Sequence, residues 1–264
     1  MKIFLISLTL LYIAVHLYFY LIQDSKIFKP QYIENEEFEL PKNTKEISLK
    51  ISNEIKLSGV YKKATKPSTQ LIIYFGGNSD DATKFLLHVK DLEDFDIIAF
   101  NYRGFVKSSG RPSQKALFED ALRIYDKFAK GKKVIVIGRS LGTGVATYLA
   151  SKRAVKNIVL ITPYDSIENL SKRNYPYLFV SVILKHKFNS LKYIKDLNTP
   201  VSIIEVVNDK TIPKQSLDNL TNNIKNLALH VKLKDTTHGD VLNHPDFEKI
   251  LKEAIYKGAD KDVK

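Results

Sequence analysis

The chain has 264 residues, 44% of them hydrophobic, so it can bury one sizeable core without a second domain. It contains no Cys, which excludes disulfides, Cys-ligated zinc and thiol nucleophiles and leaves covalent chemistry to Ser, Thr, Lys or a carboxylate. The 41 Lys and Arg against 29 Asp and Glu give a net charge of +12, which suits anionic lipid, nucleic acid or a simply lysine-rich composition.

The N-terminal segment is long and apolar. Residues 3–22 carry no charge, and Ser7, Thr9 and His16 are the interruptions. At about 1.5 Å per residue this segment reaches roughly 30 Å, enough to span the hydrocarbon core of a bilayer. It closes with bulky residues where a secretory signal peptide would have a small-residue cleavage site. We therefore expect residues 1–23 to be an uncleaved membrane anchor, on an undecided side of the membrane; a buried first helix of a soluble domain is the alternative.

Beyond the anchor, the pattern indicates a connector and then a domain of strands and helices. Residues 24–44 include two prolines and predict an irregular connector. Alternating residues at 46–51 and 54–61 predict an antiparallel hairpin. Short apolar runs of strand length follow at residues 71–75, 96–100, 133–137, 157–161, 201–207 and 228–233. Helix-length segments lie between most of them, so we expect an α/β domain over residues 45–258 with a mostly parallel sheet, followed by a frayed tail at 259–264.

The most specific motif follows the run at 133–137. In open parallel sheets, ligands bind beyond the carboxyl ends of the strands. The five residues from Gly138 to Gly142 read Gly-Arg-Ser-Leu-Gly and match G-x-S-x-G. A strand that turns sharply into a helix needs small residues two before and two after the serine, which Gly138 and Gly142 provide. The motif predicts a nucleophile elbow at Ser140; a helix cap or a phosphate cradle is the alternative.

A serine nucleophile needs a base, and the base needs a carboxylate to orient it. Asp209 and His238 both follow apolar runs, in the chain order Ser, acid, His. We therefore predict a catalytic triad of Ser140, Asp209 and His238, with His244 as the rival base. The spacing of His238, Asp240 and His244 matches no zinc motif, so neither a metal nor another cofactor is expected.

The oxyanion of an acyl-transfer intermediate needs backbone N–H donors. The residue after the nucleophile, Leu141, is one expected donor. The other should come from the glycine-rich loop after the run at 71–75, from Asn78 or Gly77, because glycine lets the backbone approach a substrate closely.

These residues resemble the bud-emergence-type α/β-hydrolases, a membrane-anchored group of serine hydrolases that includes depalmitoylase-like esterases. The resemblance lies in residues 101–113 (its arginine loop), 138–144 (its nucleophile motif), 162–166 (the start of its short insert) and 238–240 (its terminal His motif). The sequence departs from the group at Gly76, where the group usually has His. The resemblance implies the α/β-hydrolase fold and acyl hydrolysis.

The stretch at 163–199 exceeds a plain crossover and contains an apolar run at 175–184. It predicts a small cap over the site, or an ordinary helix packed on the sheet. The expected function is hydrolysis of an ester or thioester of a hydrophobic acyl substrate. A weak or inactive membrane-tethered scaffold and a serine peptidase on the same fold are the alternatives. Nucleic-acid binding is not expected, because no recognisable module accompanies the positive charge, and the oligomeric state stays open.

Overall fold

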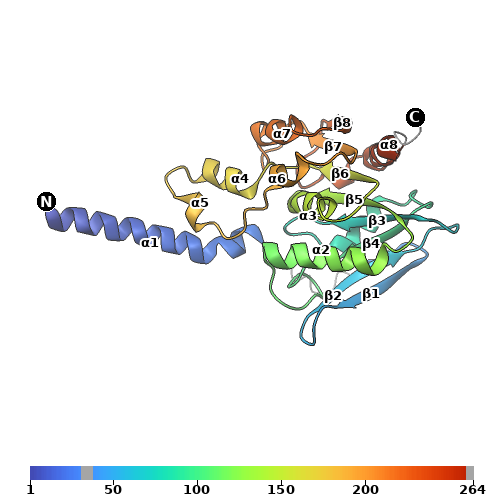
Figure 1. The fold of residues 1–264 in the computed structure, drawn as a ribbon, viewed down its shortest axis with the longest axis horizontal. Helices are drawn as coiled ribbons and strands as arrows, with labels where there is room; N and C mark the ends of the chain where they lie inside the picture. Colours follow the sequence, from blue (N-terminus) through green and yellow to red (C-terminus); the bar gives the residue numbers. More distant parts are fainter. Residues whose placement is uncertain (31–37, 260–264) are drawn as a thin grey trace.

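The computed structural model describes residues 1–30 and 38–259, which form one α/β body with a long helix projecting from it (Figure 1). The strands are β1 (Thr44–Lys50), β2 (Lys56–Lys62), β3 (Gln70–Phe75), β4 (Asp96–Phe100), β5 (Lys133–Arg139), β6 (Asn157–Ile161), β7 (Val201–Val206) and β8 (Leu227–Leu233). The helices are α1 (Lys2–Ile27), α2 (Gln114–Phe128), α3 (Leu141–Ala150), α4 (Ile167–Asn174), α5 (Val180–Ile183), α6 (Ser190–Ile194), α7 (Lys214–Thr221) and α8 (Phe247–Ala259), with 3-10 turns η1 (Ala82–His88) and η2 (Val241–Asn243).

The eight strands form one sheet in the order β1-β2-β4-β3-β5-β6-β7-β8. β1 pairs with β2, and β2 with β4, in antiparallel register, whereas every later pair is parallel. The expected antiparallel hairpin and mostly parallel sheet are therefore confirmed. Parallel strands point their carboxyl ends to one edge, so the loops after β3, β5 and β7 gather there.

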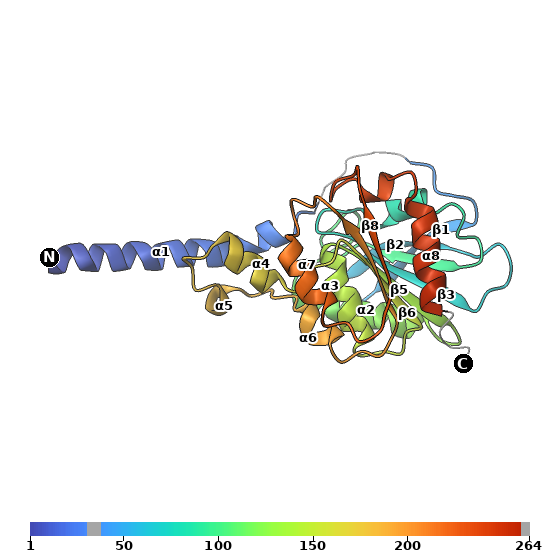
Figure 2. The same cartoon turned by 90° about the horizontal axis from the view of Figure 1, so that it is seen from above.

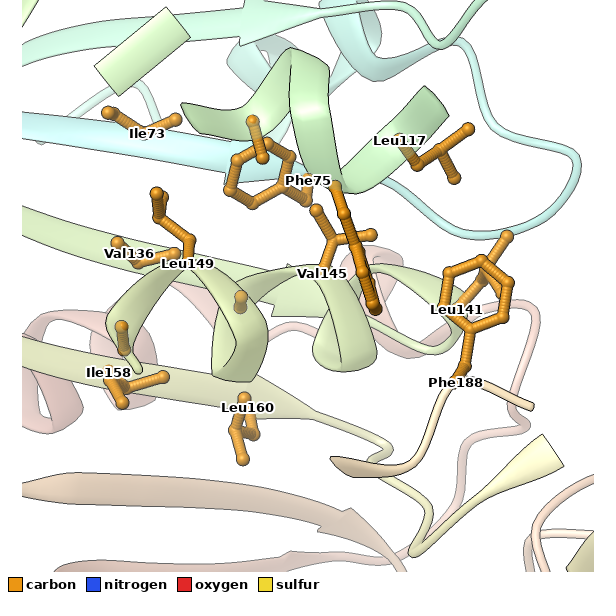
Figure 3. Packing of buried hydrophobic residues seen from close by; sticks show 14 of the residues in the cluster. Ile73, Phe75, Leu117, Val136, Leu141, Val145, Leu149, Ile158, Leu160 and Phe188 are labelled. Carbon is orange, nitrogen blue, oxygen red and sulfur yellow. The ribbon is translucent and has the colours of Figure 1, made fainter. Parts of the chain in front are cut away.

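Two apolar cores cover the two faces of the sheet, because successive strand residues point to opposite sides. Ile73 and Val136 face the core under α2, α3 and α7, while Ile72 and Ile135 face the core under η1 and α8. Figure 3 shows α3 within the first core, with Val145 and Leu149 on the side of the helix where Phe75 and Val136 lie, and Ile158 and Leu160 on its other side. This packing holds the start of α3 rigidly at the end of β5.

Helix α1 extends away from the body, with its N-terminus free of the domain (Figure 2). It has 26 residues, and a window of 18 has a mean hydropathy of 2.0 with none of it buried. In the described part of the chain this is a helix long and apolar enough to cross a membrane, by length and composition. Helices α4, α5 and α6 fall in the long insert between β6 and β7, and both views place α5 beside α1. Residues 31–37 of the expected connector, and 260–264 of the expected tail, lie outside the described residues.

Candidate active site

Ser140 occupies a tight turn between β5 and α3. Its backbone has φ 48° and ψ −117°, and its N–H donates to the carbonyl of Ile161 at 2.9 Å. The turn leaves no space for a side chain at Gly138 or Gly142. A Cβ added to Gly142 would lie 2.1 Å from the carbonyl oxygen of Phe75, and a Cβ added to Gly138 would lie 2.5 Å from the carbonyl oxygen of Gly142. The two glycines are therefore required by close backbone approach, as the motif predicts. A positive φ at a non-glycine residue is strained, and such residues cluster at functional sites.

Three side chains from distant loops form a hydrogen-bonded row at this turn. The Nε2 atom of His238 lies 2.9 Å from the Ser140 hydroxyl, and Nδ1 of the same ring lies 2.7 Å from Oδ2 of Asp209. Ser140 follows β5, Asp209 follows β7, and His238 lies in the loop after β8. The structure thus brings together all three residues that the chain order singles out.

The environment of Asp209 keeps it ionised. Burial would raise the pKa of this carboxyl, but the hydrogen bond from His238 and the N–H groups of Ile212 and Thr211 outweigh burial and hold the pKa below its ordinary value. An ionised carboxylate can only accept, so Nδ1 of His238 carries the proton and donates it. In the neutral ring Nε2 is then an acceptor, aimed at the Ser140 hydroxyl. This arrangement has the geometry in which an imidazole can take a proton from a serine hydroxyl.

Arg139 holds the loop that carries His238, a role not anticipated from the sequence. Its Nη2 donates to the carbonyls of His238 and Gly239 at 3.0 and 2.9 Å, and its Nη1 contacts the Asp80 carboxylate. The G-x-S-x-G pattern accepts any residue at this position, so the motif by itself gave no signal. Asp80, two residues beyond the glycine-rich loop, gave none either.

The predicted oxyanion donors have different environments. The Gly77 N–H donates to Oδ2 of Asp80 at 2.6 Å and is engaged in that bond. Within the described residues the N–H groups of Leu141 and Asn78 have no protein acceptor. The Asn78 carbonyl accepts the N–H of Lys29, just after α1, at 2.8 Å. The glycine-rich loop is thus fixed on one side by Asp80 and on the other by the end of the N-terminal helix.

His244, the rival base, and His230, another histidine near this end of the chain, lie in other contacts. Nδ1 of His244 accepts the N–H of Asp246, and His230 pairs with Glu205 at 2.7 Å. Neither ring is part of the row at Ser140. Over residues 1–30 and 38–259, no group of three or more His, Cys, Asp or Glu side chains is placed to hold a metal ion.

Comparison with known proteins identifies the fold. The model of the alpha/beta hydrolase fold family matches residues 75–194, a segment that contains Ser140. A solved esterase of Pyrococcus furiosus superposes with a TM-score of 0.64 at 17% identity, covering 89% of this chain and 98% of that one. With the strand order above, these matches show that the chain has the α/β-hydrolase fold.

Two vertebrate relatives are similar in sequence. Human protein ABHD12B is 30% identical over 180 residues, which cover 58% of this chain and 49% of the relative. The lysophosphatidylserine lipase ABHD12 of Danio rerio is 29% identical over 180 residues, covering 59% of this chain and 47% of the relative. The chain thus spans about half the length of these curated relatives.

Proposed function

We propose that this α/β-hydrolase-fold chain is a membrane-anchored serine hydrolase that cleaves an ester or thioester of a hydrophobic acyl group. The observation that carries the proposal is the row formed by Ser140, His238 and Asp209, with both hydrogen bonds between 2.7 and 2.9 Å. An exposed serine without a base is a poor nucleophile, whereas this geometry supplies both the base and the group that orients it.

The chemistry is acyl transfer to water. The Ser140 oxygen attacks the substrate carbonyl as His238 takes its proton, and the resulting oxyanion accepts hydrogen bonds from the backbone of Leu141 and Asn78. His238 then gives the proton to the departing alcohol or thiol, leaving an ester on Ser140. Water attacks that ester with its proton going to His238, and the acid is released as the proton returns to the serine.

Two features support an acyl substrate held near a membrane. The relative from Danio rerio is named a lysophosphatidylserine lipase, which favours a lipid with a single acyl chain. Helix α1 has the length and hydropathy of a membrane span, and we take it as the anchor. The bud-emergence-type grouping belongs to the same proposal, because its motifs coincide with the residues around Ser140.

The glycine-rich loop favours one alternative, a tethered binding protein with weak catalysis. Because the Gly77 N–H donates to Asp80, this loop offers Asn78 as its donor to an oxyanion. A serine peptidase on the same fold has no contact here that favours it over an esterase. The binding alternative predicts little turnover of simple acyl esters.

A fluorophosphonate probe on the full-length protein in mild detergent tests the proposal. It should label the wild type and the control Ser151→Ala, whose hydroxyl bonds only its own helix, but neither Ser140→Ala nor His238→Ala. Labelling that survives in Ser140→Ala would reject the assigned nucleophile. Wild-type turnover should then be measured on esters, thioesters and lysophospholipids of varied acyl length. A labelled protein that turns over none of them would favour the binding role.

A further inference from the structure

Helix α1 directs its polar side chains at the insert between β6 and β7. Tyr12, His16, Phe19 and Gln23 are spaced by four, three and four residues, so they share one face of the helix. Ser7 and Thr9, which lie nearer the N-terminus, donate instead to carbonyls of their own helix.

This face satisfies the irregular backbone of residues 175–185. The Tyr12 hydroxyl donates to the carbonyl of Tyr177 at 2.7 Å, and Nε2 of His16 accepts the N–H of Phe179 at 3.0 Å. Gln23 donates to the carbonyl of Ile183 at 3.0 Å and accepts the N–H of Lys185 at 2.6 Å. Non-helical backbone is tolerated in hydrocarbon only where protein groups satisfy its donors and acceptors. These bonds meet that condition for four backbone groups of the segment.

The contacts also set the depth of the insert along the helix. From Gln23 to Tyr12 the helix rises about 16 Å, roughly half of a 30 Å hydrocarbon core. If residues 3–22 span the bilayer, the backbone at Tyr177 lies near its middle. Three large apolar side chains point outward on this segment: Tyr177, Phe179 and Val182 are 86, 65 and 83% exposed. In water this surface would be unfavourable, and it continues the exposed apolar surface of α1.

Charged groups gather at the base of the insert and beside Ser181, whose hydroxyl donates to Glu168 and whose carbonyl accepts from Lys187. Lys185 lies 3.8 Å from Asp24 and 4.3 Å from the ring centre of Tyr20, and His186 pairs with the same Asp24 at 3.1 Å. Aromatic and cationic side chains at one level of a membrane helix mark the headgroup region. The polar boundary therefore falls near Tyr20 to Asp24, with the apolar tip of the insert beyond it.

We infer that residues 175–184 insert into the hydrocarbon of the leaflet next to the domain, packed against α1, and that bilayer acyl chains cover Tyr177, Phe179 and Val182. The inference rests on the proposed anchor. The end of α1 is bonded to the glycine-rich loop through Lys29 and Asn78, which puts the Ser140 end of the sheet on the membrane side. An acyl substrate would then reach Ser140 from the leaflet rather than from water.

The chain has no Trp, so the fluorescence of a single introduced Trp comes from that one position alone. Full-length Val182→Trp, Leu10→Trp and Tyr256→Trp would be reconstituted in vesicles of phosphatidylcholine and phosphatidylglycerol, with and without bromine on the acyl chains. Leu10 is on α1 and 62% exposed, and Tyr256 is an exposed aromatic on α8 that serves as the control. Bromolipids quench only Trp in contact with the chains.

We expect quenching and a blue-shifted emission for both Val182→Trp and Leu10→Trp, and no quenching for Tyr256→Trp. Quenching of Leu10→Trp without quenching of Val182→Trp would overturn the insertion of residues 175–184 and leave the anchor standing. Absence of quenching in both variants would overturn the anchor and the inference together.

Discussion

The guanidinium of Arg139 forms an ion pair with the carboxylate of Asp80, in which Nη1 of Arg139 lies 2.5 and 2.6 Å from the two carboxylate oxygens. Both side chains are largely buried, at 10 and 17% exposure. Through its other nitrogen Arg139 holds the His238 loop, and through Oδ2 Asp80 accepts the Gly77 N–H. One ion pair therefore connects the loop that bears the proposed base with the loop that bears the proposed oxyanion donor.

Breaking the ion pair between Arg139 and Asp80 should lower kcat strongly while weakening substrate binding only a little. Arg139→Met and Asp80→Asn each leave a buried partner uncompensated, which costs about 3–5 kcal/mol in the free energy of unfolding. A displacement of about 1 Å at His238 would lower kcat roughly 100-fold. We expect KM to change little, and the double variant to lose less activity than the two single losses combined, because the residues act as a unit. Steady-state kinetics on a short soluble ester measures these effects.

Arg103 and Asp120 offer a matched control. They form another buried Arg–Asp pair, with bonds of 2.8 and 2.6 Å and side chains 13 and 4% exposed. Arg103→Met should destabilise the fold by a similar amount, measured by urea unfolding, yet leave kcat close to wild type. An equal fall of kcat in Arg103→Met would mean that Arg139 acts through general stability and does not position His238.

The sequence predicted the residues at the strand ends of this site, but not the side chains that hold the loops in place. Strand ends were predictable because fully buried parallel strands read as short apolar runs, so Asp209 and the loop of His238 could be placed at one edge of the sheet. Arg139 and Asp80 could not be, since neither apolar periodicity nor a motif position reports a pairing between loops distant in sequence. The same reason hid the bonds from Tyr12 and His16 to the insert, because a polar group in an apolar run does not report which distant segment it contacts.

Gly142→Ala should abolish activity and destabilise the fold. The added Cβ would sit 2.1 Å from the carbonyl oxygen of Phe75 and 2.6 Å from that of Gly76, so the glycine-rich loop must move away from Ser140. Changes of this kind cost about 4 kcal/mol or more. Gly239→Ala is the control, because the nearest atom to its Cβ would be 3.8 Å away, an ordinary contact. Thermal unfolding and turnover should both be near wild type in Gly239→Ala; a normal Gly142→Ala enzyme would refute the packing at the elbow.

Asp209→Asn should reduce kcat by about 10⁴-fold on a soluble ester, because an amide no longer fixes the imidazole with its proton on Nδ1. The fold should survive, since the amide oxygen can still accept from Thr211 and Ile212. A loss of less than about tenfold would show that Asp209 does not orient His238.

Asp209→Asn should also change how the free energy of unfolding depends on pH in the acidic range. Hydrogen bonds hold the pKa of Asp209 below its ordinary 3.8, so folding favours the ionised form. That stabilisation is fully present above pH 3.8 and is lost as the pH falls through the lower folded-state pKa. The free energy of unfolding should therefore fall more steeply on acidification in the wild type than in Asp209→Asn. Urea titrations at a series of acidic pH values measure the difference, and parallel curves would contradict the assigned direction.

A charge added to residues 175–184 should lower turnover of substrates in a membrane but not turnover of soluble substrates. Val182 is 83% exposed, so Val182→Asp adds a carboxylate without touching the core. A charge at the centre of a bilayer costs about 2.5–3.5 kcal/mol. Val182 adjoins Ile183, which bonds Gln23 near the polar boundary, so a smaller cost applies there and would push the insert out of the lipid. Turnover of a lysophospholipid in vesicles should fall roughly 10- to 100-fold, because about 1.4 kcal/mol corresponds to a factor of ten, while turnover of a short soluble ester stays the same. Asn53→Asp, in the exposed turn between β1 and β2, adds the same charge away from α1 and should change neither rate. Equal losses on both substrates would assign Val182 to the site itself, and no loss on either would place the insert in water.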